Sequence, residues 1–322
     1  MNKIAALFNK GKTRSKSTNG DGFRKKRKRR NSVGACIFIV VMLAYPVLQF
    51  LITWLYVNIN SVALVFQRQN EFFEYEWVGF DNVIAFFRSF KIDPATRQVY
   101  LNSFLYMPVT CMISIPLATV FSYFLYKEMP LSGVFRVIYF IPNIIPVVAL
   151  TLAFRMPFEP GYGFLNVLMQ KMGLHLQYFG KEPNAQIMVY IYCIWAGLGY
   201  NIVLLSGAIG RVPEEVLESA RLDGVGPMRE FFQFVVPLIW PTLTTLIILG
   251  MTNVLTLYLQ PYLLTKGANG TQTIGMVIFT ISQSDRNLES AATTGLLCSL
   301  IWAPVILTVR HFMSKCFAGV DY

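Results

Sequence analysis

Apolar residues dominate this chain in six long runs, which short polar segments separate. The runs lie near residues 34–58, 101–126, 133–156, 186–209, 236–260 and 290–313. Each reaches the roughly 20 residues that a helix needs to cross a ~30 Å hydrocarbon core. Since the runs contain almost no ionisable side chains, the pattern predicts an all-α, polytopic membrane protein with six transmembrane helices.

The composition agrees with this pattern. Of the 322 residues, 54% are hydrophobic and only 14% are charged. The mean hydropathy is +0.48. A soluble domain would need more polar residues to cover its surface, so these values favour the membrane class.

Positive charge is concentrated at the N-terminus. The net charge is +11, and twelve of the 28 Lys and Arg residues lie in the first 30 residues, which end in RKKRKRR. The run fits a nucleic-acid or localisation patch, a contact with anionic lipid, or the positive-inside flank of a first span. As a flank it places both termini in the cytoplasm. We therefore expect a basic cytoplasmic tail, residues 1–33, and a six-helix membrane domain, residues 34–322.

One polar segment, residues 211–237, gathers acids, bases and glycines between the fourth and fifth runs. It contains PEEVLESARLDGVGPMREFFQFVVP, residues 213–237. Pro213 suits a first helical position, Glu214 and Glu215 suit the positive end of a helix dipole, and Gly224 suits a helix C-terminus. A first short helix is predicted over residues 213 to about 223, on the cytoplasmic side.

A second short helix is predicted from Pro227. Apolar residues recur on one face of it, at Met228, Phe231, Phe232 and Val235, while Arg229, Glu230 and Gln233 fall on other faces. Such a stripe packs on the chain's own bundle, lies on the membrane, or enters a partner's groove.

Motifs for catalysis or metal binding are not found in the sequence. Gly11-Lys12-Thr13 is the one candidate for a phosphate loop, but Ala6 stands where that loop needs its first glycine. His175 and His311 are predicted on opposite membrane faces, so no metal site follows. The sequence predicts no catalytic residue, no cofactor in this chain and no nucleic-acid partner.

The loop between the fourth and fifth runs resembles the EAA loop of permease subunits in binding-protein-dependent ABC importers. That motif is Glu-Ala-Ala, three residues, Gly, nine residues, Ile, one residue, Leu-Pro. This chain keeps the spacing with Glu218-Ser219-Ala220, Gly224, Phe234 and Val236-Pro237. The Asp before the glycine and the pair Pro237 and Pro241 resemble the version in maltose-type carbohydrate permeases.

The resemblance extends over residues 34–322. WVGFDN, YFIPNIIP and LTKGANGTQT are each similar to family segments beside or within the second, third and last spans. Ala268-Asn269 depart from the Gly-Pro that is frequent in the last of these.

The resemblance implies a transporter subunit without a nucleotide site of its own. It implies two cytoplasmic ATPase subunits that bind ATP and Mg, a second homologous permease subunit, an extracytoplasmic solute-binding protein, and a bacterial inner membrane as location. The residues implied to contact the ATPase are Glu218, Ser219, Ala220, Asp223, Gly224 and Pro237.

Polar and aromatic residues within the fourth and fifth runs are candidates for a sugar pathway near mid-membrane. They are Trp195, Tyr200, Asn201, Asn253, Thr256 and Tyr258. Each of them also suits plain helix packing. Two other functions fit parts of the sequence: a self-sufficient carrier or channel, and a receptor or scaffold that acts through its basic tail.

Overall fold

The computed structural model describes residues 33–174, 177–283 and 287–316. The predicted basic tail, apart from Val33, and His175 lie outside the described residues. The chain divides into two units, residues 1–56 and 57–322. The described part is helical except for one short hairpin, which confirms the predicted all-α class.

The described part of the first unit consists of α1 (Val33–Gln49) and η1 (Phe50–Tyr56). No charged residue occurs in either element, and the side chains of residues 34–56 are exposed. A helix that is apolar all round suits a lipid environment. The candidate span Gly34–Val65 includes both elements and ends within α2 (Val57–Val65).

Three further helical segments in the second unit are long and apolar enough to cross a membrane. They are α4–η2–α5 (Pro94–Pro108, Val109–Ser114, Ile115–Tyr126), α9 (Asn184–Ile209) and α16 (Leu288–Cys316). Two bent pairs also pass this test when each pair is taken together. The first pair joins α6 (Ser132–Ile144) to α7 (Val147–Arg155) and η3 (Met156–Phe158). The second joins α11 (Pro227–Glu230), η4 (Phe231–Val235) and α12 (Val236–Leu238) to α13 (Trp240–Thr256). By length and composition, the described residues therefore hold four spans, or six when each bent pair counts as one.

The third apolar run is broken rather than continuous. Its two helices meet at an angle of 110°. Ile145 precedes Pro146 and has an extended backbone, with φ −79° and ψ 134°. A proline ring disfavours the helical conformation of the residue before it, so α6 ends here and α7 starts in a new direction. The sequence predicts this run as one span over residues 133–156, and the structure shows a much larger change of direction than a kink.

Shorter elements lie at the end of the second unit that carries the hairpin. β1 (Gln67–Gln69) pairs antiparallel with β2 (Tyr75–Trp77), and Arg68 faces Glu76. The helices at this end include α3 (Asp81–Ile92) and α15 (Ile274–Gln283). Elsewhere lie α8 (Phe164–Lys171) and α14 (Leu259–Thr265). Asn82 is buried and donates hydrogen bonds to the carbonyl oxygens of Val65 (3.0 Å) and Gln67 (2.7 Å), which ties α3 to the hairpin.

Asp93 fixes the start of α4. Its carboxylate accepts hydrogen bonds from the backbone N–H of Ala95 (3.0 Å) and of Thr96 (3.1 Å) and from the Thr96 hydroxyl (2.7 Å). The Thr96 hydroxyl and the two backbone donors lower the pKa of Asp93, so the cap is charged at neutral pH.

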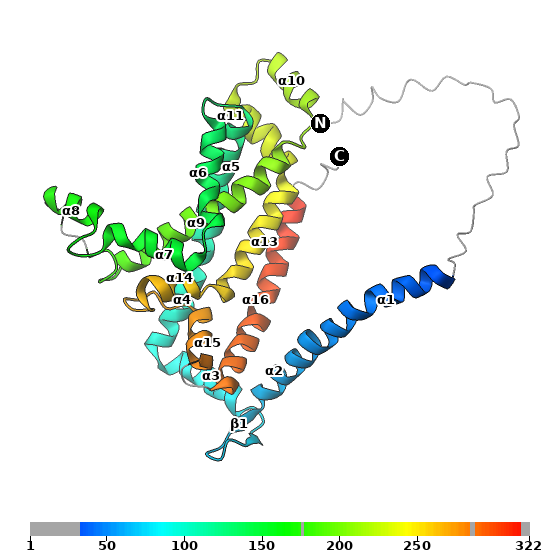
Figure 1. The fold of residues 1–322 in the computed structure, drawn as a ribbon, viewed down its shortest axis with the longest axis vertical. Helices are drawn as coiled ribbons and strands as arrows, with labels where there is room; N and C mark the ends of the chain where they lie inside the picture. The colour runs from blue at the N-terminus through cyan, green and yellow to red at the C-terminus, as the bar shows by residue number, and fades with distance from the viewer. Residues whose placement is uncertain (1–32, 175–176, 284–286, 317–322) are drawn as a thin grey trace, which may run out of the picture. The chain divides into compact units, whose positions relative to one another are not determined.

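The core lies where α5, α9 and α13 pack together, and Figure 1 shows these helices side by side with α6 and α16. Fully buried members are Ile202, Leu205, Ile209, Leu217 and Met251. The Ser122 hydroxyl donates to the carbonyl oxygen of Ile202 at 3.2 Å, which joins α5 to α9. A bundle of this kind positions everything described below.

Candidate functional site

The segment 211–237, here called the coupling segment, begins with the short helix α10 (Glu214–Leu222). Gly224 has a left-handed backbone, with φ +78°. The N–H of Val225 donates to the carbonyl of Ala220 (3.0 Å), and the N–H of Gly224 donates to that of Arg221 (3.0 Å). This pair of bonds is a Schellman motif, which requires a residue that tolerates positive φ. The predicted helix and its glycine terminus are therefore both observed.

Helix α10 has an inner and an outer face, and Figure 1 shows the helix projecting from the end of the bundle. Leu217 (0% exposed) and Ala220 (4%) face the core. The remaining predicted contact residues of this helix and its C-terminus, namely Glu218, Ser219, Asp223 and Gly224, are exposed. Of the six predicted contact residues, Ala220 is buried against the bundle and Pro237 is half-buried in α12. The other four are exposed and accessible to a partner.

The apolar stripe after Pro227 is divided between two environments. Phe231 and Val235 are buried, and the Phe231 ring lies 5.1 Å from the Tyr123 ring on α5, measured between centroids. Met228 and Phe232 are 64% and 61% exposed. The helix widens to π geometry over Phe231–Val235, which changes the positions that share a face. Phe231 therefore packs the helix against α5, whereas the Phe232 side chain is exposed.

Glu230 is a buried acid that the sequence pattern does not reveal. Its side chain is 1% exposed, and its carboxylate lies 2.8 Å from Lys127 Nζ and 3.1 Å from Arg221 Nε. The hydrogen bond to Glu230 raises the pKa of Arg221, so the guanidinium is charged throughout the physiological range. Spacing alone placed Glu230 away from the apolar stripe. Its burial depends on the contacts with Arg221 and Lys127, because a buried charge requires a partner.

A second feature is a cavity of about 470 Å³ among α5, α6, α9 and α13, here called the pathway cavity. Four of the six predicted pathway residues line it: Tyr200, Asn201, Asn253 and Thr256. Asn201 donates to the Ser114 hydroxyl at 3.4 Å. Ile145, where α6 ends and the chain changes direction into α7, also lines the cavity. Discontinuous helices commonly border binding sites in transporters.

The other two predicted pathway residues lie elsewhere and make aromatic contacts. Trp195 stacks on Phe154, with ring centroids 5.7 Å apart, and Tyr258 stacks on Phe279 at 4.9 Å. In contrast, the cavity lining includes two polar residues that sequence reasoning missed, Asn143 and Gln260. Asn143 stands in YFIPNIIP three residues before Pro146, and a polar residue this close to a predicted proline kink is a usable sequence signal.

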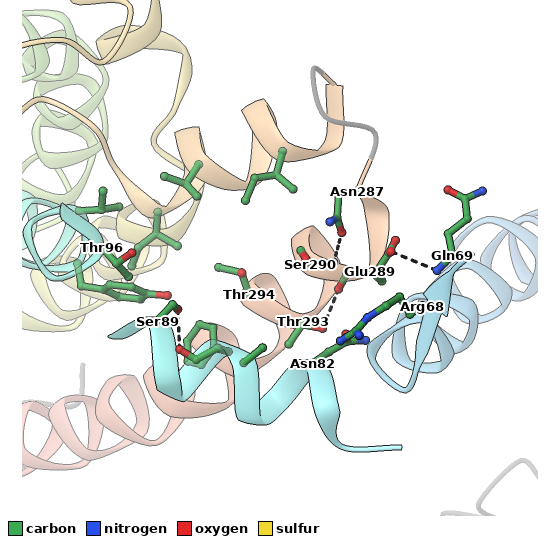
Figure 2. Close-up of a pocket in the computed structure, with 17 residues that line it drawn as sticks. Arg68, Gln69, Asn82, Ser89, Thr96, Asn287, Glu289, Ser290, Thr293 and Thr294 are labelled. Atoms are coloured by element: carbon green, nitrogen blue, oxygen red, sulfur yellow. Dashed lines mark hydrogen bonds between the residues drawn. The ribbon is translucent and has the colours of Figure 1, made fainter. Parts of the chain in front are cut away.

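A third feature is a recess of about 560 Å³ beside the hairpin, drawn in Figure 2 and here called the hairpin recess. Arg68 donates to Asn82 Oδ1 (3.3 Å), and the backbone N–H of Gln69 donates to Glu289 Oε1 (3.3 Å). The recess shares no lining residue with the pathway cavity. Its polar residues come from α3, α4, α16 and β1, so no local motif announces it.

The structure offers no cluster suited to a metal ion within the described ranges 33–174, 177–283 and 287–316. An exposed acidic helix at one end and an internal polar cavity are the two arrangements that require a function.

Residues 111–314 match the family described as binding-protein-dependent transport system inner membrane component. The chain belongs to this family. The matched range contains the coupling segment and nearly all of the pathway cavity, so both lie in the part that defines the family. Membership of this family makes the chain a membrane permease component of a transporter.

Two named permease proteins are similar to this chain. It is 29% identical over 250 residues to the probable ABC transporter permease protein YurN of Bacillus subtilis, covering 75% of this chain and 82% of that protein. It is 26% identical over 253 residues to the diacetylchitobiose uptake system permease protein NgcF of Streptomyces coelicolor, covering 74% and 72%.

The fold is similar to that of a bacterial alginate ABC transporter solved in complex with an alginate pentasaccharide-bound periplasmic protein. The TM-score is 0.77 at 16% identity, and the match covers 90% of this chain and 98% of that chain. This likeness shows that the helices are arranged as in an ABC transporter permease.

Proposed function

We propose that this chain is the permease subunit of an ABC importer that moves a sugar or oligosaccharide across the bacterial cytoplasmic membrane. ATP hydrolysis in two separate ATPase subunits drives the transport, and α10 receives their movement. A second, homologous permease subunit and an extracytoplasmic solute-binding protein complete the complex, while ATP and Mg bind to the ATPase subunits. Both termini and α10 lie in the cytoplasm, and lipid surrounds the spans.

The observation that carries the coupling role is the two-sided character of α10. Leu217 and Ala220 hold the helix against the bundle, while Glu218 and Asp223 point away from it. A short helix with a fixed inner face transmits a displacement, and its charged outer face orients the contact with a partner. Glu218, Ser219, Asp223 and Gly224 then form the surface that the ATPase contacts.

The pathway cavity supports a neutral, hydroxyl-rich substrate. Its described lining holds amides, hydroxyls and aromatic rings but no charged side chain. Sugar hydroxyls both donate and accept hydrogen bonds, which Asn and Gln side chains satisfy in either sense. The name of one relative points the same way, since diacetylchitobiose is an uncharged carbohydrate.

Purification in mild detergent, followed by identification of co-purifying subunits, tests the proposal. We expect ATPase subunits and a second permease subunit in the complex, and ATP-dependent sugar uptake after reconstitution with the binding protein. A thermal-shift screen of that binding protein against sugars identifies the substrate. Uptake by the purified chain alone, with no ATPase subunit present, would instead establish a self-sufficient carrier.

Replacing Asn253 with leucine is expected to impair uptake through loss of a hydrogen bond to the sugar. The variant keeps the size of the side chain but removes its amide from the cavity lining. One neutral hydrogen bond contributes about 1 kcal/mol, so uptake below saturation should fall about fivefold. The measurement is the initial rate of uptake into proteoliposomes at several sugar concentrations.

The matched control is Thr252→Val on the same helix. Thr252 is exposed, donates to the carbonyl of Leu249 (2.7 Å) and lies outside the cavity lining. Its uptake should equal that of the wild type. Equal uptake by the Asn253 variant would remove this residue from the pathway.

A further inference from the structure

Glu230 joins the two short helices of the coupling segment to the end of α5. Lys127 follows the C-terminal end of α5, Arg221 belongs to the last turn of α10, and Glu230 itself ends α11. Both Lys127 and Arg221 contact the same carboxylate, at 2.8 and 3.1 Å. The acid is 1% exposed, whereas Lys127 and Arg221 are 25% and 42% exposed. The carboxylate thus forms the buried centre of this ion-pair cluster.

The cluster spans the link between the two short helices of the coupling segment. Between α10 and α11 the chain passes through Gly224-Val225-Gly226, where the two glycines restrict the backbone least. The ion pair from Arg221 to Glu230 crosses this link and holds the two helices together. The pair thus adds a direct connection from α10 to α11 to the packing of Leu217 and Ala220 against the bundle.

The next contact leads from α11 to α5. The Tyr123 hydroxyl donates to the carbonyl oxygen of Pro227 at 3.0 Å, and Lys127 holds Glu230 from the same end of α5. These contacts join the first and last residues of α11 to one helix. A displacement of α11 must therefore move α5 or break both contacts.

Helix α5 reaches the pathway cavity at its other end. Ile115, at the start of α5, and Ser114 just before it line the cavity. Tyr123 lies eight residues further along, or about 12 Å at the rise of an α-helix. Because an α-helix is stiff over this length, a push on the Tyr123 end changes the position of the cavity wall.

We propose that Glu230 is the positioning residue that links α10 to α5 and so transmits the movement of the ATPase subunits to the pathway cavity. The inference rests on the proposed function, in which the ATPase docks on α10. It adds a specific route from α10 through Arg221, Glu230 and Lys127 to α5. Glu230 acts through its two basic partners and contacts neither ATP nor sugar.

The test is Glu230→Gln in the complete complex, reconstituted with its ATPase subunits, partner permease and binding protein. The amide removes the negative charge that both bases require, while nearly keeping the size of the side chain. We expect uptake to fall about tenfold or more, and this fall corresponds to an ion-pair coupling of modest size. The rate of ATP hydrolysis should change less than about twofold. The ATP hydrolysed per sugar transported should therefore rise at least about fivefold.

Three matched variants separate transmission from general damage. Glu128→Gln removes an exposed acid next to Lys127 and should keep the wild-type ratio. Glu230→Asp retains the charge and should restore part of the uptake. Lys127→Gln keeps the pair between Arg221 and Glu230 but removes the ion pair that joins Glu230 to the end of α5, and it should raise the ratio as Glu230→Gln does.

The outcomes decide the inference in every case. A wild-type ratio in Glu230→Gln overturns it, and so does a parallel fall of uptake and hydrolysis. If Glu230→Gln does not assemble, Lys127→Gln gives the answer: a raised ratio supports the route and an unchanged ratio overturns it. Failure of the proposed function is visible separately, because the wild-type complex itself would then show no ATP-dependent uptake.

Discussion

Replacing Gly199 with alanine is expected to destabilise the bundle strongly. Gly199 lies in α9, where α6 approaches closely, and it is buried. A methyl group at this position would collide with the carbonyl oxygen of Tyr139 and with the side-chain amide of Asn143. One obstacle is backbone, so helix α6 itself must shift. Overpacking of this kind costs about 1–3 kcal/mol. The midpoint of thermal unfolding in detergent should fall by roughly 5–10 °C.

The same helix supplies the control for this experiment. A Cβ at Gly207 meets nothing within 4 Å, so Gly207→Ala makes the same chemical change in open space. Alanine favours a helix over glycine by about 0.5–1 kcal/mol, so this variant should unfold at or slightly above the wild-type midpoint. Equal midpoints for both variants would show that α6 and α9 do not pack closely at Gly199. The contact also borders the pathway cavity, since Asn143 lines it.

The sequence was most informative where a signal is local. Each of the six apolar runs corresponds to a long helix or a bent helix pair, because hydrophobic length alone selects a span. The end of α10 was also predictable, since a helix that closes with a left-handed residue favours glycine, and Gly224 stands there. Four of the six predicted pathway residues line one cavity because the fourth and fifth runs lie next to it.

Tertiary contacts explain the features that the sequence did not reveal. Helical periodicity placed Glu230 on a polar face, but Lys127, over a hundred residues away, pairs with it in the interior. The π geometry of Phe231–Val235 changed which aromatic residues are buried. Trp195 and Tyr258 belong to the right helical regions but contact Phe154 and Phe279 instead of lining the cavity. None of these outcomes follows from the spacing of residues along one helix.

Replacing Gly224 with aspartate is expected to abolish most ATP-dependent uptake while leaving the permease folded. A side chain at this position meets nothing within 4 Å in this chain, and aspartate tolerates a left-handed backbone better than most residues. The fold should therefore survive. The new carboxylate would protrude next to Asp223, from the surface where we propose that the ATPase approaches the backbone closely. We expect uptake into proteoliposomes to fall more than about tenfold, equivalent to a loss of at least ~1.4 kcal/mol in the docking contact. The amount of co-purifying ATPase should fall with it.

Gly133→Asp is the matched control for this loss. Gly133 lies in the first turn of α6 and is exposed, and a Cβ at this position would meet nothing within 4 Å, so it accepts the same substitution outside the coupling segment. An acid near a helix N-terminus is favourable, and this variant should transport at the wild-type rate. Full uptake by Gly224→Asp would refute docking at this turn.

The two coupling-segment variants should also differ from each other, because Gly224→Asp weakens the attachment of the ATPase whereas Glu230→Gln leaves it attached and hydrolysing. If the Glu230→Gln complex hydrolyses ATP without transport and the Gly224→Asp complex loses its ATPase, docking on α10 and transmission through α11 and α5 are separate steps.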